Sequence, residues 1–470
     1  MKFTKMSLVA ALLMGSSAFA IDNIKMSGDA KLFYMTTDGT SGSQAIKNLV
    51  YGTNDTGSLF SKNASAADAA LNLNITADLF KNDMVAISAG AGYTVLSTLG
   101  LENNMVSNVW GGAHEATVGT GSTYGNVVGG AKVENANWMN EAWLAVTAGK
   151  TTLKLGRMEL DTPLAFTETW SIEKNTFEAA VVVNQDIPDT TLVGAYVGNG
   201  NGNETFGQNL NSNVQGLGLA VGPVVNRNGE FATYGTDGAY AFGVVNSSVK
   251  GLTVQGWYYD VLKLVDAYWL QADLEMDGII AGVQYTSAKV KDNGMGGLAS
   301  ADSDSVYAVQ LGYAMKDMAT IKVAYSAVND NTQSTSANLG GAGFNTATST
   351  GASKLYTEAW WNYGYVVQTN TETIHVSVES PVNGLFDLGV YYTDANQGNT
   401  SGAVNPAFVG TDMKELTVTA GKDFGPLNAT LAYVYTKADD QNVDPIAAAI
   451  NPATKGSAYN SIQAYLTVNF

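Results

Sequence analysis

The chain has 470 residues and no cysteine, with 42 acidic against 24 basic side chains and a formal net charge of −18. This acidity argues against nucleic acid and anionic surfaces as partners, and the lack of cysteine excludes a disulfide-stabilised fold. With 51 glycines, 23 tyrosines and only eight prolines, the composition favours a β-rich chain with many turns.

The first twenty residues, MKFTKMSLVAALLMGSSAFA, follow the order of a secretory signal peptide. Two lysines precede a short apolar stretch, and small residues close on Ala18-Phe19-Ala20. We therefore expect residues 1–20 to be a signal peptide cleaved after Ala20, with residues 21–470 as one exported domain. The loss of two lysines takes the formal charge from −18 to −18 − 2 = −20. No later segment has the run of about 20 apolar residues that a membrane helix needs, so a helical membrane protein is excluded.

Apolar and polar residues alternate with a period of two in many segments. Between positions 71 and 79 the odd positions are apolar and the even positions polar, as Leu73 and Asn74 illustrate. Similar alternation recurs at 85–92, 307–313, 321–326, 374–379, 415–420 and 461–470. Successive side chains of a strand point to opposite faces, so each segment predicts a strand with one apolar face.

Two kinds of connection alternate along the chain. Short turns are expected at 80–83, 148–150, 185–189, 247–251, 276–278, 316–318, 380–384 and 423–426. Longer segments are expected at 37–66, 99–138, 158–175, 198–237, 261–263, 291–302, 329–368, 395–411 and 438–457, of which only the fifth is short. This order predicts an antiparallel up-and-down β-barrel of about 18 strands with both termini on the turn side. The count could change by two, because residues 354–368 could form a strand or part of a loop.

A water-soluble β-sandwich also alternates, but its loops have similar lengths at both ends. The contrast between tight turns and long loops, with the export signal and aromatic residues near strand ends, predicts a transmembrane barrel in the bacterial outer membrane. Phe470 would then end the last strand with its side chain towards lipid. Terminal Phe residues of outer-membrane proteins are recognised by the barrel assembly machinery, so Phe470 is predicted to be the assembly signal.

About 18 strands enclose a lumen too wide for side chains to fill, so a water-filled channel is expected. The alternation predicts that its wall is lined by Asp29, Lys31, Asp78, Glu141, Lys154, Glu178, Asp273, Lys322, His375, Glu379 and Glu415. Acids outnumber bases in this set, and most of its members are expected to be solvated wall residues without a specific role.

The third long segment, 158–175, is poor in glycine and carries opposite charges close together. The stretch GRMELDTPLAFTETWSIEKNTFEAA, which contains this segment, resembles the Campylobacter-type major outer membrane porin family, together with the signal peptide, the acidic composition and the terminal Phe. LGRMELDTPL is also similar to the corresponding segment of OprD-type specific porins. The resemblance implies an 18-stranded homotrimeric porin whose third extracellular loop folds into the barrel. It places a constriction at Glu159, Asp161, Glu168 and Glu173, with Arg157 and Lys174 at its base.

A charged constriction sorts ions, because partial desolvation strengthens each Coulomb interaction. We therefore expect a cation-preferring porin for passive diffusion of ions and small hydrophilic solutes. OprD-type porins line their wall with arginines, whereas this chain has only Arg157 and Arg227. General diffusion is accordingly favoured over a channel dedicated to carboxylates.

Other classes of function were weighed on the same residues. An enzyme is not expected, because His114 and His375, the two histidines, lie in no recognisable hydrolase motif. A surface adhesin or antigen anchored by the barrel remains an alternative, since loops often carry recognition. No cofactor is expected. The acidic residues at 302–304 and 439–444 leave a divalent cation such as calcium, bound in a loop or the pore, as an open alternative.

Overall fold

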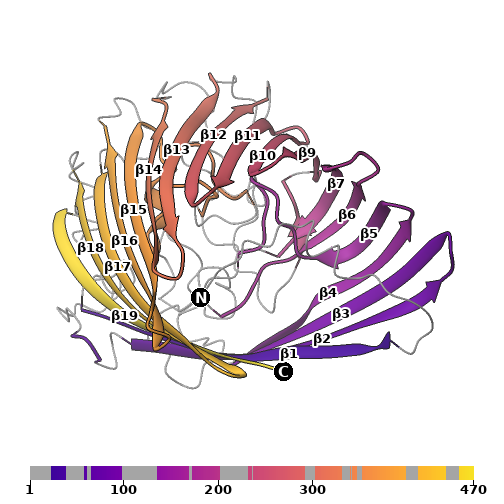
Figure 1. Cartoon of the computed structure of the whole chain (residues 1–470), viewed down its shortest axis with the longest axis horizontal. Helices are drawn as coiled ribbons and strands as arrows, with labels where there is room; N and C mark the ends of the chain where they lie inside the picture. The colour runs from indigo at the N-terminus through magenta and orange to yellow at the C-terminus, as the bar shows by residue number, and fades with distance from the viewer. Residues whose placement is uncertain are drawn as a thin grey trace, which may run out of the picture.

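The protein is a single closed antiparallel sheet. The computed structural model describes residues 23–38, 58–60, 65–97, 135–168, 172–201, 231–235, 237–291, 302–330, 339, 341–346, 352–398, 411–440 and 455–470. Nineteen strands form the sheet, which closes because β1 (Lys25–Thr37) pairs with both β2 (Ser65–Lys81) and β19 (Lys455–Asn469). Figure 1 shows the resulting ring. The prediction of a closed up-and-down β-barrel is confirmed.

The strands follow one another round the wall in chain order. The others are β3 (Val85–Ser97), β4 (Asn135–Ala148), β5 (Thr151–Met158), β6 (Phe177–Asn184), β7 (Thr190–Gly200), β8 (Ala232–Thr233), β9 (Ala239–Val249), β10 (Leu252–Val261), β11 (Val265–Met276), β12 (Ile279–Val290), β13 (Asp304–Met315), β14 (Ala319–Val328), β15 (Thr371–Val382), β16 (Phe386–Gln397), β17 (Thr411–Phe424) and β18 (Leu427–Asp440). β8 has two residues and pairs only with the end of β7, while β9 pairs with β7 along its length. The wall therefore has 19 − 1 = 18 full strands, as expected.

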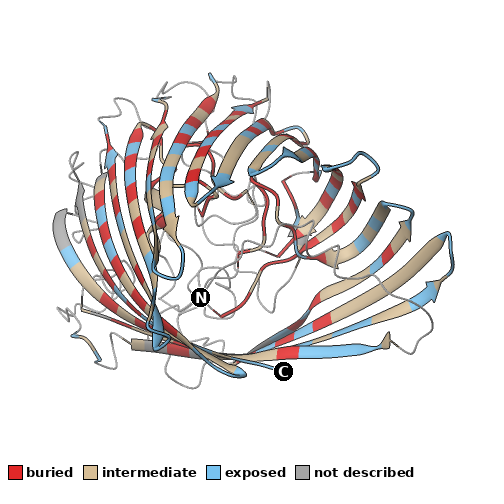
Figure 2. Cartoon of the chain, viewed as in Figure 1, coloured by how far each residue is buried: buried red, intermediate tan, exposed pale blue. Residues whose placement is uncertain are grey.

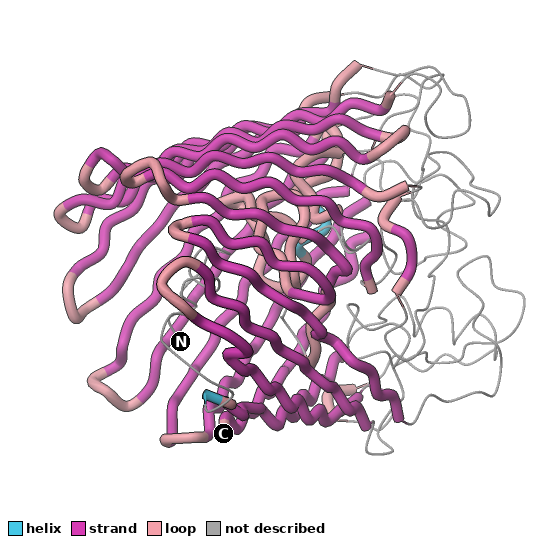
Figure 3. The backbone as a smooth tube through the Cα atoms, turned by 90° about the vertical axis from the view of Figure 1, so that its right-hand side faces the viewer, coloured by secondary structure: helices cyan, strands magenta, loops and turns pink. Residues whose placement is uncertain are grey.

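Short connections join the strands at one end of the barrel, as Figure 3 shows. The start of β1 and the end of β19 lie at this same end. All eight predicted turns join consecutive strands. Two of them place successive residues at positive φ, Asp277 (54°) with Gly278 (85°) and Asn383 (47°) with Gly384 (68°). These are the dihedrals of a type I′ hairpin, whose twist matches that of the flanking strands.

Residues 354–368 contribute no strand to the wall. They contain a 3₁₀ helix, η5 (Tyr363–Tyr365), and Gln368 makes an isolated bridge with Gly341. This segment, which the sequence left open between strand and loop, belongs to the connection between β14 and β15. Nowhere in the described ranges is a helix long and apolar enough to cross a membrane.

The outer face of the wall is apolar and exposed. Buried and exposed residues alternate along most strands, as Figure 2 shows. The exposed positions include Leu311 at 68%, Phe242 at 53% and Ile75 at 41%. Their inward neighbours on the same strands are polar or small. The predicted orientation, apolar stripes outward, matches this pattern.

The inner face of β6 to β13 departs from the expected polar lumen. Val181, Val193, Trp257, Tyr259 and Trp269 point inward there and are almost completely buried. They pack with residues from two connections that fold into the barrel, such as those at 160–164 and 339–367. One side of the lumen is therefore filled largely by an apolar cluster, although polar groups such as Gln271 and Asp273 also face inward on β11.

Candidate functional site

The connection between β5 and β6, residues 159–176, is called here the third-loop segment. It reaches across the lumen, because the Leu164 amide donates to the Tyr259 hydroxyl on β10 at 3.3 Å while Ile172 packs with Phe33 on β1 and Trp138 on β4. The predicted inward fold of the third loop is confirmed. Residues 169–171 lie outside the described part of the chain.

The connection between β14 and β15, residues 339–368, also enters the lumen and is called the second inward segment. Asn345 joins it to the third-loop segment: its Oδ1 accepts from the Phe166 amide at 3.1 Å, and its Nδ2 donates to the Phe166 carbonyl at 2.9 Å. The Thr346 amide donates to the Leu164 carbonyl at 2.9 Å. Two segments far apart in sequence thus form one structure inside the barrel.

Glu415 on β17 holds the far end of the second inward segment. Its carboxylate accepts hydrogen bonds from the Trp361 amide at 3.0 Å, the Asn362 amide at 2.8 Å and the Asn362 side chain at 2.8 Å. Asn362 also donates to Thr436 and accepts from Tyr459. Glu415 is almost fully buried, so this inward acid is a structural anchor in contact with the segment rather than an open wall group.

Opposite charges meet where the third-loop segment leaves the wall. Lys174 Nζ lies 3.0 Å from Glu141 on β4 and also pairs with Glu159, and Lys154 on β5 lies over the Trp143 ring at 4.2 Å. Burial by itself lowers the pKa of Lys174, but Glu159 and Glu141 outweigh it and hold that pKa above its ordinary value. Lys174 therefore stays charged, and one ammonium compensates two carboxylates.

The other predicted acids of the third-loop segment differ in their surroundings. Asp161 pairs with Lys354 of the second inward segment, and a third of its side chain is exposed. Glu168 is buried and accepts from Asn345 Nδ2 at 2.8 Å. Glu173 is fully buried, and burial raises its pKa despite nearby Lys31 and Asn72. Of the four predicted constriction acids, only Glu159 and Asp161 present their carboxylates to open space.

Arg157 and Glu178 lie on the outer face of the wall, not in the lumen. Their neighbours Met158 and Phe177 are the inward, buried residues of β5 and β6. Arg157 Nε donates to Glu178 Oε1 at 2.9 Å, and Glu178 also pairs with Asn199. The expectations of a constriction role for Arg157 and a pore-lining role for Glu178 are wrong, because the period of two through these strands sends both side chains outward.

The remaining predicted wall residues share the inward face of their strands. On β1, Asp29 pairs with Lys31 at 3.3 Å. Near the turns Asp78 accepts from Asn23 at 3.4 Å, and Asp273 accepts from Gln271 at 2.7 Å.

Polar side chains also lie on the inner face of β14 to β16. Lys322 faces the lumen there, two residues from Ala324, which pairs with His375. His375 is buried and shares a 2.9 Å hydrogen bond with Thr393. Glu379 accepts from Tyr391 at 2.9 Å.

Two functional contributors, Lys354 and Asn345, were not found from the sequence. Lys354 neutralises Asp161 and lies 5.0 Å from the Phe166 ring centre. The segment's own cue was its aromatic content between 356 and 365, which is unusual for a solvated loop. Across the described residues no group of three or more His, Cys, Asp or Glu side chains is placed to hold a metal ion.

No protein-family model and no curated protein matches this sequence. Solved structures do match over nearly the whole chain. OpdK of Pseudomonas aeruginosa, solved with vanillate, is 12% identical over 96% of this chain and 99% of that chain, with a TM-score of 0.65. OccAB3 of Acinetobacter baumannii is 11% identical over 96% of this chain and 100% of that chain, with a TM-score of 0.67. At this identity the likeness establishes the fold alone; it agrees with the OprD-type part of the resemblance and gives no support to the Campylobacter-type part.

Proposed function

We propose that the protein is an outer-membrane porin, a water-filled channel through which ions and small hydrophilic solutes diffuse passively. The observation that carries this proposal is the opposite polarity of the two faces: exposed apolar residues outside, with paired charges on the inner wall of β1 to β5 and hydrogen-bonded polar groups on that of β14 to β16. Together the two inward segments occupy part of the lumen and so narrow the water-filled passage. Neither of them adds a strand to the wall. The fold shared with OpdK and OccAB3 is consistent with this function.

We further propose a modest preference for cations. Of the predicted lumen charges that point inward and are not buried, taken together with Lys354, seven are acids and five are bases. The acids are Asp29, Asp78, Glu141, Glu159, Asp161, Asp273 and Glu379, and the bases are Lys31, Lys154, Lys174, Lys322 and Lys354. Because most acids have a basic partner, the preference should be weaker than the overall charge of the chain suggests.

The test is conductance in planar bilayers, with the reversal potential measured in a salt gradient. Asp161→Asn should lower the cation-to-anion permeability ratio, because it removes an accessible negative charge beside the Lys354 ammonium. Glu168→Gln is the matched control, since it changes a buried carboxylate hydrogen-bonded to Asn345. An unchanged reversal potential for Asp161→Asn would reject its place in the passage, and a closed wild-type barrel would reject the porin itself.

The cellular setting belongs to the same proposal. We propose cleavage after Ala20, residence in the outer membrane and assembly as a homotrimer. Membrane fractionation with N-terminal sequencing tests the first two, and the mass of the detergent-solubilised complex tests the third. A monomeric mass would leave the channel intact and remove the trimer.

A further inference from the structure

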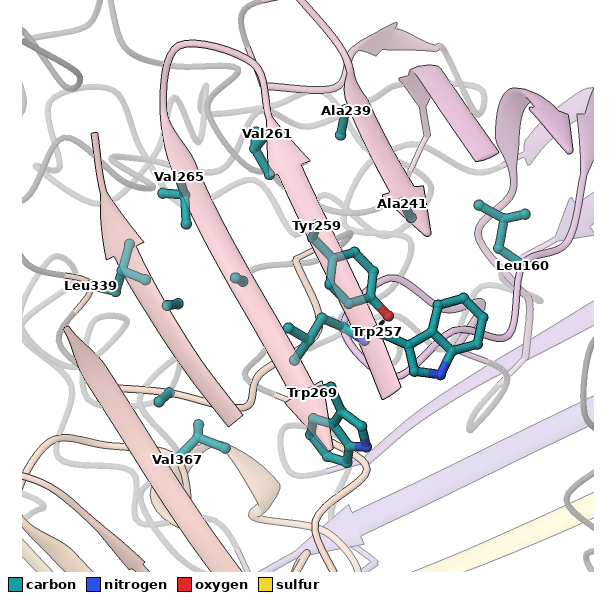
Figure 4. Packing of buried hydrophobic residues seen from close by; sticks show 14 of the residues in the cluster. Leu160, Ala239, Ala241, Trp257, Tyr259, Val261, Val265, Trp269, Leu339 and Val367 are labelled. Carbon is teal, nitrogen blue, oxygen red and sulfur yellow. Dashed lines mark hydrogen bonds between the residues drawn. The ribbon is translucent and has the colours of Figure 1, made fainter. Parts of the chain in front are cut away.

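An apolar pocket lies between the inner wall and the two inward segments. It is lined by inward residues of β9 to β12, by Leu164 of the third-loop segment, and by Leu339 and Phe344 of the second inward segment. Figure 4 shows Tyr259 and Val261, both on β10, and Leu339 of the second inward segment in this region. The cavity measures about 40 Å³ and is partly open, and none of its lining side chains is charged. An uncharged lining cannot compensate the desolvation of an ion, so a neutral occupant is favoured.

One hydroxyl of the pocket has no partner. Thr286 on β12 lines the cavity and is 1% exposed, and its Oγ1 makes no hydrogen bond with any described residue. The hydroxyls of Tyr234 and Tyr259 are engaged, because Tyr234 bonds to Thr346 and Tyr259 accepts from the Leu164 amide. A buried polar atom left unpaired is unfavourable, so a ligand group that satisfies Thr286 would gain binding free energy.

We propose that this pocket binds a small neutral alcohol or phenol, whose hydroxyl bonds to Thr286 and whose apolar body extends from the cavity towards the open side of the pocket. Charged solutes are disfavoured, because no lining group would compensate their desolvation. The site lies beside the passage and is built from the contact between the two inward segments. It does not depend on ion conduction, so it stands or falls separately from the proposed function.

Binding of 4-fluorophenol and of fluorobenzene to the detergent-solubilised protein can be followed by fluorine NMR line broadening. Ala267→Leu fills the pocket, and Thr286→Val removes the hydroxyl while keeping the shape. Ala272→Leu is the matched control, because position 272 lies on the outer face of the same strand, β11. Folding of every variant is checked by its heat-dependent mobility in gels, and Ala288→Val replaces Ala267→Leu if the larger change prevents folding.

The wild type and Ala272→Leu should broaden both probes, and Ala267→Leu should abolish the broadening. Thr286→Val should weaken 4-fluorophenol several-fold and leave fluorobenzene unchanged. Equal broadening in all four proteins would mean that the probes only partition into detergent, and it would overturn the site. Unchanged 4-fluorophenol affinity in Thr286→Val would overturn the role of the hydroxyl.

Discussion

Lys174 is the side chain on which the charges of the third-loop segment converge. It pairs with Glu141 on the wall and with Glu159 at the start of the segment, and it is shielded from water more than either exposed partner. In partly desolvated surroundings each of these charges acts more strongly on a passing ion than it would in bulk water. Lys174, Glu141 and Glu159 are called here the Lys174 triad. The net charge of this triad therefore has more influence on ion selectivity than the total charge of the chain.

Lys174→Gln should raise the cation-to-anion permeability ratio, because it leaves two carboxylates without their shared cation. Since the pKa of Lys174 is raised, the wild-type ratio should not shift through this residue between pH 7 and the ordinary lysine range. The measurement is the reversal potential in a salt gradient. Lys414→Gln is the control, because Lys414 pairs with Asp394 on the outer face. A permeability ratio that does not rise would show that these three charges do not act on the conducted ions.

The sequence predicted that several of these charged residues face the lumen, but it did not predict which residues they pair with. Alternation correctly places Asp29, Glu141 and Lys154 on the inward face, because a strand's period is a local property. Alternation failed for Glu178. On β6 the inward residues are Phe177, Ala179 and Val181, so Glu178 points outward and not into the lumen as predicted. Lys354 could not be found at all, because its ion pair with Asp161 joins residues 193 positions apart.

The second inward segment depends on one carboxylate for its attachment to the wall. Glu415→Ala would remove the carboxylate that accepts from the part-buried amides of Trp361 and Asn362, at a cost of about 1–3 kcal/mol for each lost bond. We expect the segment to detach, and single channels to show larger conductance with more open-state noise. Protease cleavage within residues 352–368 should also accelerate.

Glu379→Ala is the control for this change. Glu379 is an inward acid on β15 that bonds to a wall tyrosine and to neither inward segment among its described contacts. It should alter selectivity slightly and leave the noise and the cleavage rate as in wild type. If Glu415→Ala behaves in the same way, the segment is held by its apolar contacts instead.

Phe470 closes the seam of the barrel with its main chain and presents its ring to the outside. Its amide and carbonyl both pair with Gly28, at 3.0 and 2.9 Å, and its side chain is 59% exposed. Gly28 has no side chain, and a Cβ there would lie 2.7 Å from the Phe470 ring. The seam therefore needs the Phe470 backbone, while the exposed ring is free for recognition during assembly.

Phe470→Ala keeps the main-chain pairing and removes only the ring. We expect lower levels in the outer membrane with normal export across the inner membrane, because the assembly signal is lost. Fractionation and immunoblotting measure both quantities. Val468→Ala, on the same outer face and 37% exposed, is the control and should assemble normally. Normal outer-membrane levels of Phe470→Ala would show that the ring is not needed for assembly.

The strands and turns were predictable from the sequence because their signals are local: a period of two, and Asp-Gly or Asn-Gly where two positive φ angles are needed. The inward segments were not. Their position is fixed by contacts such as Asn345 with Phe166, which are 179 residues apart. The inner apolar cluster has the same origin, since Trp257 and Tyr259 look like lipid-facing residues until the segments that cover them are known.

The outer face of the whole barrel exposes apolar side chains, and this exposure would be unfavourable in water. Long aliphatic side chains lie on the outer face of the described strands, and the largest buried apolar cluster lies inside, where the two inward segments cover the wall. A lipid surround is the environment that makes such an exterior stable. The orientation of the side chains is thus tied to the proposed location in a membrane.

Neighbouring residues on β2 test this orientation directly, because Ile75 is exposed on the outer face and Thr76 is exposed on the inner face. Ile75→Arg should lower the free energy of unfolding in lipid vesicles by about 2–4 kcal/mol, the cost of a charge near the middle of the bilayer. Thr76→Arg should change it little, because that side chain meets water. Denaturant titrations followed by fluorescence measure both values. The reverse order, with Thr76→Arg the more destabilising, would mean that the outer face meets water and would remove the channel along with it.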